Sequence, residues 1–212
     1  MNRRVMILFS VIMLVIATYI LGWSSLFTVS AIEVNGSGTQ ITPGITLGQK
    51  LARVEPRAIA AKFENLDWVA SAKVSRNWVN GKVTIDITER IPIARYNNMA
   101  LDSTGKSFKL RGQPAANLLN IQAEDLEAAT KAVTFFTTLP TDLKSILTVV
   151  KVLSAGDLVL EVNNAGKNLE IRWGIDGDNQ LKQKVYQALI TLPENAGIKR
   201  IDVSAPHAPI VQ

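Results

Sequence analysis

One apolar segment constrains this chain more than any other feature of its sequence. Val5–Trp23 contains nineteen residues and no charge. A helix of that length, at about 1.5 Å per residue, reaches ~28 Å and matches a hydrocarbon layer of ~30 Å. Tyr19 and Trp23 lie towards one end, where amphipathic rings favour the lipid head groups. A buried helix of a soluble domain would need a large domain around it, so we expect a transmembrane helix over residues 5–23.

The flanking charges predict how this helix is oriented. Arg3 and Arg4 precede the apolar segment, and the next basic residue after it is Lys50. Lys and Arg next to a membrane span are retained on the cytoplasmic side. Residues 1–4 are therefore expected to form a short cytoplasmic tail, and everything after about Ser24 is expected to lie on the outer side of the cell membrane.

A cleaved signal peptide is the alternative interpretation. Val29-Ser30-Ala31 fits the small-residue pattern that precedes a cleavage point. The apolar stretch, however, exceeds the ~7–15 residues of a typical signal core. Cleavage there would also cut through the first strand predicted for the next domain. We favour the uncleaved anchor, which makes the lipid bilayer the first expected partner.

Composition excludes several classes of function. The chain has no cysteine, which excludes disulfide scaffolds, thiol nucleophiles and iron–sulfur clusters. Its single histidine, His207, excludes a multi-histidine metal site and lies in a proline-flanked segment, a poor place for a positioned base. The net charge is +5, and apart from Arg3 and Arg4 the basic residues are scattered. That pattern indicates a solvated surface and no nucleic-acid partner.

The first exported region is expected to form a small sheet with helices on one face, in the order β-α-α-β-β. The hairpin is the clearest signal, because two alternating segments flank Asn80-Gly81, a pair typical of primed turns. The helix after Glu55-Pro56 should place Ile59, Phe63 and Leu66 on one face. The expected elements are a strand with a phase shift or bulge at 27–34, a short helix within 44–54, a helix from residue 56, and strands at 72–78 and 83–87.

The rest of the chain is expected to form a second, mixed α/β domain with an antiparallel-rich sheet, so the predicted fold class is α+β. Helices are expected over Ala123–Leu139, stopped by Pro140, and over Asn179–Leu192, ending before Pro193. Alternation and turn residues predict strands at 93–96, 99–101, 106–110, 146–153, 158–162, 169–173, 198–203 and 208–211.

Three motif-like segments carry no convincing chemistry. Ala100–Ser107 ends like a phosphate-binding loop but has alanine where the first glycine is needed, so a turn between strands is the better interpretation. Asp176–Asn179 lacks most ligands of a calcium loop and is better explained as a helix cap. His207 is interpreted as an exposed loop residue. No catalytic, cofactor-binding or metal residue is predicted, and no small-molecule substrate is expected.

In the absence of such chemistry, strand edges become the candidate site. An edge strand presents unpaired N–H and C=O groups that accept another chain. Short motifs also follow one another in a defined order and spacing: Phe27-Thr-Val29, Ile32-Glu-Val34-Asn-Gly36, Trp68–Trp78, Val83-Thr-Ile85, Glu89–Ala94, Leu101–Phe108, Trp173-Gly174, Lys182 and Ile201–Pro206. Through these motifs the sequence resembles the FtsQ/DivIB family of bacterial cell-division proteins over nearly its whole length.

The resemblance implies an organisation and a function. The expected domains are a transmembrane helix at 5–23, a POTRA domain at 27–95 and an FtsQ-type β-domain at 96–212. The family is non-enzymatic and scaffolds the complex that builds the septal wall, so no cofactor is implied. Its members bind two small bitopic partners, FtsB and FtsL, and FtsB adds a strand to the end of the β-domain. The matching segment here is Ala208, Pro209, Ile210 and Val211.

The sequence departs from the family pattern in places. Val79 follows Trp78 where the family has proline, and the 41–54 stretch fits the first POTRA helix poorly. Two other hypotheses stay open on the sequence alone. One is another POTRA-bearing envelope component with a binding or transport role. The other is a wall-modifying enzyme, for which the sequence offers neither paired carboxylates at a defined spacing nor a metal site.

Overall fold

The computed structural model describes residues 3–22, 27–38, 42–110, 118–164 and 166–212. The chain divides into two compact units, Met1–Arg90 and Ile91–Gln212. Sequence analysis placed this boundary after Arg95. The structure divides the chain earlier because residues 94–96 form a strand of the second sheet.

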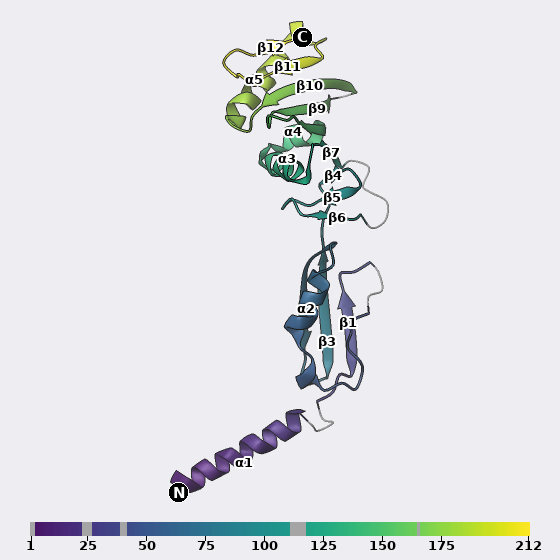
Figure 1. Ribbon diagram of the computed structural model, residues 1–212, viewed down its shortest axis with the longest axis vertical. Helices are drawn as coiled ribbons and strands as arrows, with labels where there is room; N and C mark the ends of the chain where they lie inside the picture. The colour runs from purple at the N-terminus through teal and green to yellow at the C-terminus, as the bar shows by residue number, and fades with distance from the viewer. Residues whose placement is uncertain (1–2, 23–26, 39–41, 111–117, 165) are drawn as a thin grey trace. The chain divides into compact units, whose positions relative to one another are not determined.

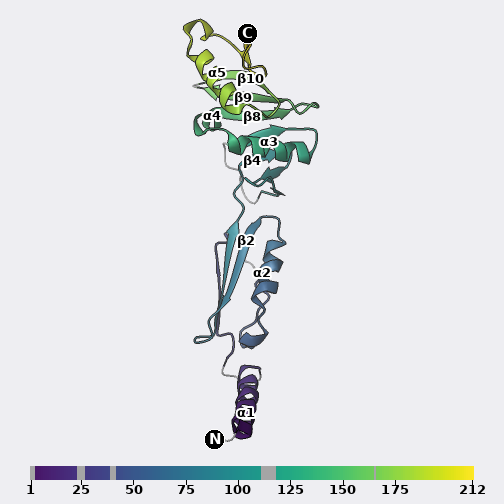
Figure 2. The ribbon, with the colours of Figure 1, turned by 90° about the vertical axis from the view of Figure 1, so that its left-hand side faces the viewer.

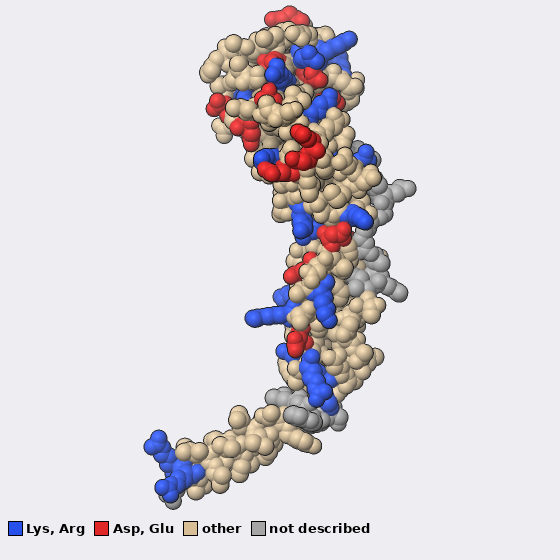
Figure 3. All heavy atoms as spheres, in the orientation of Figure 1, with Lys and Arg blue, Asp and Glu red and all other residues tan. Residues whose placement is uncertain are grey.

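Helix α1, Arg3–Gly22, matches the expected membrane span. Among the described residues it is the one helix long and apolar enough to cross a membrane. It begins two residues earlier than predicted and includes both arginines, while Met1, Asn2 and Trp23 lie outside the described residues. In the space-filling view α1 carries charge only at its start (Figure 3).

The serine and threonine hydroxyls within α1 are satisfied inside the helix. Ser10 Oγ donates a hydrogen bond to the carbonyl of Met6 at 3.0 Å, and Thr18 Oγ1 donates to the carbonyl of Leu14 at 2.8 Å. Such local bonds remove the cost of placing a free hydroxyl in hydrocarbon. Apolar side chains on all sides of the helix are exposed, including Leu14 at 69%. This is the pattern of a helix solvated by lipid.

The rest of unit 1 is a three-stranded sheet with one covering helix (Figures 1 and 2). The strand order is β1-β3-β2, with β1 parallel and β2 antiparallel to the central strand β3. The elements are β1 Ala31–Asn35, the 3-10 turn η1 Leu51–Arg53, α2 Pro56–Glu64, β2 Val69–Arg76 and β3 Lys82–Glu89.

The core of unit 1 follows the predicted periodicities. Ile59 and Phe63 of α2 are buried against Val83 and Ile85 of β3. Leu66 is 38% exposed because α2 ends at Glu64, before a third turn could carry this residue to the core.

The predicted phase shift at 27–34 is a change of partner, not a bulge. Thr28 bridges to Lys50, and the Val29 N–H donates to the carbonyl of Gln49 at 2.8 Å. From Ala31 onwards the chain pairs with β3 instead. Val29, Ile32 and Val34 all lie in or against the same core cluster, so the switch in alternation falls where the strand changes partner.

The hairpin between β2 and β3 has a wider turn than the predicted two-residue turn. Its loop is Asn77–Gly81, so Trp78 lies in the loop and not in the strand. Asn77 Oδ1 accepts hydrogen bonds from the N–H groups of Val79 at 2.9 Å and Asn80 at 3.3 Å, which closes the loop. Within the loop positive φ occurs at Gly81 (72°) and not at Asn80, so the turn is not of the primed type.

Unit 2 is a nine-stranded mixed sheet with its three helices on one face (Figures 1 and 2). The strand order is β12-β11-β10-β9-β8-β7-β4-β5-β6, with parallel pairs β4–β7, β7–β8 and β10–β11 and antiparallel pairs elsewhere. The elements are β4 Ala94–Tyr96, β5 Met99–Leu101, β6 Ser107–Phe108, β7 Leu119–Gln122, α3 Leu126–Thr138, α4 Thr141–Ile146, β8 Leu147–Val152, β9 Leu158–Asn164, β10 Lys167–Gly174, α5 Asn179–Thr191, the 3-10 turn η2 Pro193–Asn195, β11 Arg200–Asp202 and β12 Ile210–Val211.

Sequence analysis missed two elements of unit 2, placed the start of one helix three residues too early and gave Asp178 a capping role that the structure does not show. Strand β7 and helix α4 are short and lack a strong period. Helix α3 begins at Leu126 because the Asp125 carboxylate caps it, accepting from the Ala128 N–H at 2.7 Å. Asp178 precedes α5 in the left-handed region (φ 50°) and makes no side-chain cap hydrogen bond, contrary to the predicted capping role.

Gly36 provides a test of the unit 1 fold. Its φ is +77°, and a Cβ atom there would lie 1.9 Å from the Ile87 carbonyl oxygen. Gly44 also has positive φ (+66°), but nothing lies within 4 Å of a Cβ there. Gly44→Ala should lower the free energy of unfolding by ~1–2 kcal/mol, the cost of left-handed backbone strain alone. We expect Gly36→Ala to lower it by clearly more, because the clash with Ile87 adds to that strain. Urea unfolding of both variants in detergent measures this, and equal losses would contradict it.

Candidate functional site: the C-terminal sheet edge

One apolar residue from each of six neighbouring strands forms a continuous row across unit 2. The first five members are at most 2% exposed, whereas the last, Val211 of the outermost strand β12, is 38% exposed. The row therefore extends from the buried core to an edge strand, β12, whose apolar side chain is partly exposed to solvent. In order from β7 to β12 its members are Ile121, Val150, Leu160, Ile171, Ile201 and Val211.

The main chain at this edge alternates between paired and unpaired residues. The Gln212 N–H donates to the Arg200 carbonyl at 2.9 Å, and the Arg200 N–H donates to the Gln212 carbonyl at 3.0 Å. In an antiparallel pair the main-chain groups of successive residues point to opposite sides. The N–H and C=O of Val211 therefore point away from β11, towards the outside of the sheet.

The turn before β12 is held by polar contacts. The Asp202 carboxylate accepts from the Ser204 N–H at 2.9 Å and from the Ser204 hydroxyl at 2.6 Å. Gly174 ends β10 with φ +75°, and a Cβ atom there would lie 2.7 Å from the Ser204 Cβ. The close approach fixes where the chain turns back to form β12. His207 lies in this turn and is exposed, as the sequence predicts.

The structure brings the four predicted partner-binding residues to this edge. Ile210 and Val211 form β12, and Ala208 and Pro209 lead into it. All four are exposed. Ile210 is 56% exposed and lies opposite Asp202, so its side chain is on the helix-free face, whereas Val211 shares the face of the buried row. The edge thus presents an apolar side chain on each face.

Charged pairs cover the helix-free face beside β12. Arg200 Nε lies 2.8 Å from Glu170 Oε1, and Arg172 lies 3.3 Å from Asp157 and 3.7 Å from Asp202. Of these side chains, Glu170, Arg172, Arg200 and Asp202 border a hollow of about 390 Å³. Ile210, Val159 and Leu153 form its apolar lining. Sequence reasoning missed this cluster. Period-two alternation can place each charge on a face, but only strand register shows which charges become neighbours.

Lys151 of β8 extends the same cluster. Its ammonium group pairs with Glu161 and lies 4.0 Å from Glu170. The hydrogen bond that Lys151 donates to Glu161 raises the pKa of Lys151 above the ordinary lysine value, although desolvation opposes the shift. Exposed pairs of this kind contribute ~0–1 kcal/mol each, so the cluster matters more for the pattern of charge beside the edge than for stability.

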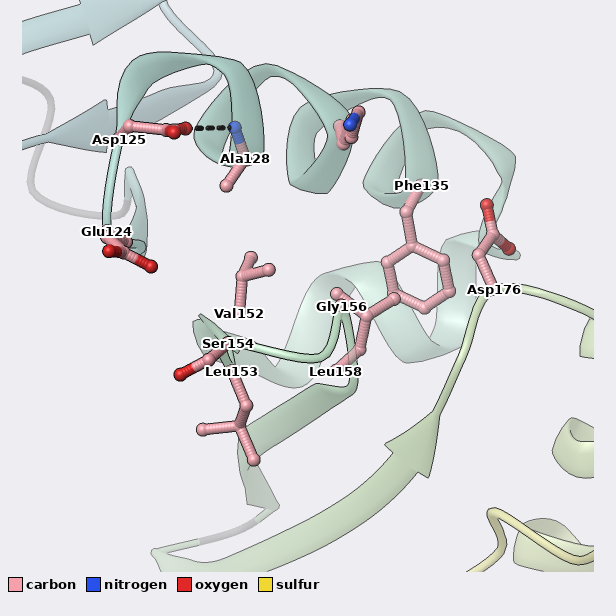
Figure 4. A pocket seen from close by; sticks show the side chains of 11 residues that line it. Glu124, Asp125, Ala128, Phe135, Val152, Leu153, Ser154, Gly156, Leu158 and Asp176 are labelled. Atoms are coloured by element: carbon pink, nitrogen blue, oxygen red, sulfur yellow. Dashed lines mark hydrogen bonds between the residues drawn. The ribbon is translucent and has the colours of Figure 1, made fainter.

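A second hollow, of about 370 Å³, lies between the start of α3 and the β8–β9 turn (Figure 4). Phe135, Val152 and Leu158 contribute apolar surface to it, and Glu124 and Asp176 contribute carboxylates. Its remaining carboxylate caps α3. Histidine is not among the lining residues, and we assign no reaction to this hollow.

The segment Ala100–Ser107, whose sequence partly matches a phosphate-binding loop, contains the turn between β5 and β6. Asp102 is 6% exposed, and its Oδ1 accepts from the N–H groups of Thr104 and Lys106 at 2.9 and 3.0 Å and from the Thr104 hydroxyl at 2.6 Å. A carboxylate occupied in this way organises the turn. The described residues contain no group of three or more His, Cys, Asp or Glu arranged to hold a metal ion.

Lys182 is a buried lysine of α5. It is 2% exposed and donates a hydrogen bond from Nζ to the Ile175 carbonyl at 2.7 Å. Nearby, Trp173 Nε1 donates to Asn179 Oδ1 at 2.8 Å, and Asn179 Nδ2 donates to Asp176 Oδ1 at 2.6 Å. These bonds hold the loop between β10 and α5. Desolvation lowers the pKa of Lys182, although the carboxylates of Asp178, Asp176 and Asp157 oppose the shift.

Comparisons with known proteins agree with this architecture. Residues 27–90 match the family model described as "POTRA domain, FtsQ-type". The chain is 27% identical over 163 residues to "Cell division protein FtsQ" of Salinibacter ruber, an alignment that covers 70% of this chain and 62% of the relative. The chain thus spans less than two thirds of that relative's length. These findings support the FtsQ/DivIB family and confirm a POTRA domain of the FtsQ type after the apolar helix α1.

The lowered pKa of Lys182 predicts a pH dependence. The unfolded chain keeps the ordinary lysine pKa of about 10.4, so between the lowered folded value and that value the unfolded state binds more protons. The free energy of unfolding then rises with pH. We expect the free energy of unfolding of the wild type, minus that of Lys182→Met, to increase as the pH rises from neutrality towards 10. Urea unfolding of both proteins at each pH measures this difference. A difference that is flat or falls with pH would contradict it.

Proposed function

We propose that this chain, a member of the FtsQ/DivIB family of cell-division proteins, is a non-enzymatic bitopic scaffold of the divisome. Helix α1 anchors it in the cell membrane with the N-terminus in the cytoplasm, and both units lie on the outer side at the division septum. It recruits FtsB-like and FtsL-like partners and so links them to septal peptidoglycan synthesis. The orientation rests on Arg3 and Arg4, which precede every other basic residue of the chain by more than forty positions.

The observation that carries this proposal is the uncovered end of the apolar row at β12. A strand laid alongside β12 would bond to the outward N–H and C=O of Val211 and cover its half-exposed side chain. Ile210 would contact the same strand, or the segment leading into it, on the other face. Main-chain bonds of this kind provide affinity, and the side chains on alternate faces provide specificity.

Pro209 limits how the added strand can pair. It lies two residues before Val211, and by the same alternation its nitrogen faces outwards. Proline has no N–H to donate, so at this position only its carbonyl is available to the incoming strand. We therefore expect the partner strand to form its full exchange of hydrogen bonds with Val211 and to accept nothing from Pro209.

The other edge of the same sheet fits a partner less well. Strand β6 ends the sheet at Ser107–Phe108, and Phe108 is only 4% exposed. An added strand would gain main-chain bonds there but no apolar side chain from Phe108. Strand β12 offers both, which is why we place the partner at the C-terminal edge.

Substituting Val211 tests the proposed strand addition. Val211→Pro removes the outward N–H and leaves the bonds between Gln212 and Arg200 in place. We expect this variant to lose FtsB-like partner in co-purification from membranes, while Val211→Ala, which keeps the N–H, retains more of it. The free energy of unfolding of both variants serves as the control for folding. Undiminished co-purification with Val211→Pro, or after deletion of residues 208–212, would contradict the site.

Localisation separates this proposal from another POTRA-bearing envelope component. A fluorescent fusion of the full chain should form a band at midcell. A uniform signal around the envelope would favour a binding or transport role outside division.

A further inference from the structure

The hairpin loop of unit 1 presents an apolar tip that the proposed partner site does not use. Val79 is 98% exposed, and the neighbouring Trp78 is 36% exposed. The Trp78 ring packs edge-on against Phe27, with ring centroids 6.0 Å apart. We call Phe27, Trp78 and Val79 the aromatic tip. Single exposed apolar residues are ordinary, so the argument rests on what surrounds these three.

The loop that carries the tip is held rigidly. Asn77 closes it from within, and Ser30 binds it from the neighbouring chain segment, donating from Oγ to the Asn80 carbonyl at 2.5 Å. The Ser30 N–H also donates to the Gly81 carbonyl at 2.9 Å. Val79 is therefore held in the solvent by a fixed backbone and cannot fold back to bury itself.

The Arg76 side chain stacks against the ring of Trp78. Its guanidinium lies 5.1 Å from the Trp78 ring centroid and donates to the carbonyls of Leu51 at 2.8 Å and Val54 at 2.7 Å. A tryptophan stacked on a cation and bordered by polar main chain is the amphipathic arrangement that favours the lipid–water interface.

Chain connectivity brings the aromatic tip close to the membrane anchor. Four residues separate Gly22, the end of α1, from Phe27. Five extended steps span at most about 18 Å. If α1 crosses the bilayer, Phe27 and the loop packed on it must lie within that reach of the end of the span, where the head-group region begins.

The charge of this end of unit 1 complements lipid. Residues 50–57 include the two carbonyls to which Arg76 donates. This segment contains three basic residues, Lys50, Arg53 and Arg57, and one acidic residue, Glu55. Arg53 and Arg57 are exposed. Basic side chains near a membrane surface are attracted to anionic phospholipids by about 1 kcal/mol each.

We propose that the aromatic tip docks on the surface of the bilayer that α1 spans, with Trp78 and Val79 inserted among the head groups and Arg53 and Arg57 next to anionic lipids. This second contact would restrict unit 1 to a narrow range of tilts above the membrane. The inference rests on the membrane anchoring in the proposed function but not on the partner site at β12.

The natural absence of cysteine allows a direct test with single-cysteine variants of the full chain. Val79→Cys carries an environment-sensitive fluorophore on the tip. Ile91→Cys is the matched control, because Ile91 is also apolar and 75% exposed but follows the far end of β3, about 27 Å away along eight residues of strand. Ser10→Cys, in the middle of α1, reports the anchor itself.

Each labelled protein is reconstituted into vesicles of phosphatidylethanolamine and phosphatidylglycerol, with and without quenchers on the acyl chains. We expect the Val79→Cys probe to shift to the blue and to be quenched several-fold more than the Ile91→Cys probe. Quenching at Ser10→Cys without quenching at Val79→Cys would overturn the inference and leave the anchor intact. Loss of quenching at both would overturn anchor and inference together.

A Val79→Cys fluorophore that is shielded from water, but that the acyl-chain quenchers do not quench, would also overturn the inference. In that case a second copy of the chain covers the tip, and the shielding should depend on protein density in the vesicle. Shielding that is independent of density and sensitive to the acyl-chain quencher supports contact with lipid.

Discussion

The register of the nine-stranded sheet is the constraint on which the rest of unit 2 depends. It aligns one apolar residue per strand into a row that the helices cover from one side, and it gathers the charged side chains of β8 to β11 on the other. A shift of one residue in any strand would exchange the two faces. The same register leaves Val211 half covered at the end of the row, so the feature that stabilises the core also creates the candidate binding edge.

Buried and partly buried polar side chains in both units fix loops through hydrogen bonds. Arg76 binds two carbonyls of the η1 segment, Asp102 closes the β5–β6 turn, and Lys182 holds the loop before α5. Asp102 and Lys182 are buried and Arg76 is partly buried, and each makes hydrogen bonds to main-chain groups, which lowers the cost of removing a polar side chain from water. Loops held in this way can present side chains such as Val79 in a fixed position, which suits a protein that acts by contact.

Much of the fold could be predicted because its signals are local. The apolar span, the buried positions of β3 and the spans of β8 to β10 follow from hydrophobic period and turn residues alone. Where the prediction differed, either a contact distant in sequence or a local side-chain cap was responsible. Val29 and Ala31 face different partners, 48–51 and β3, and Trp78 lies in a loop because Asn77 caps it. The short elements β7 and α4 depend on their neighbours for stability and leave no period of their own.

By itself, the sequence determined that a charge-free stretch precedes two α+β regions without cysteine or a cluster of metal ligands, because such properties depend on residue type and spacing. It also indicated which four residues would lie near the partner edge, through a family resemblance. Only the tertiary structure decided that Val211 turns its main chain outwards and that Pro209, which has no N–H, lies beside it at the edge. It likewise decided that Phe27 meets Trp78 across fifty residues of chain. Pairing direction and register arise from contacts between distant segments, and no local pattern specifies them.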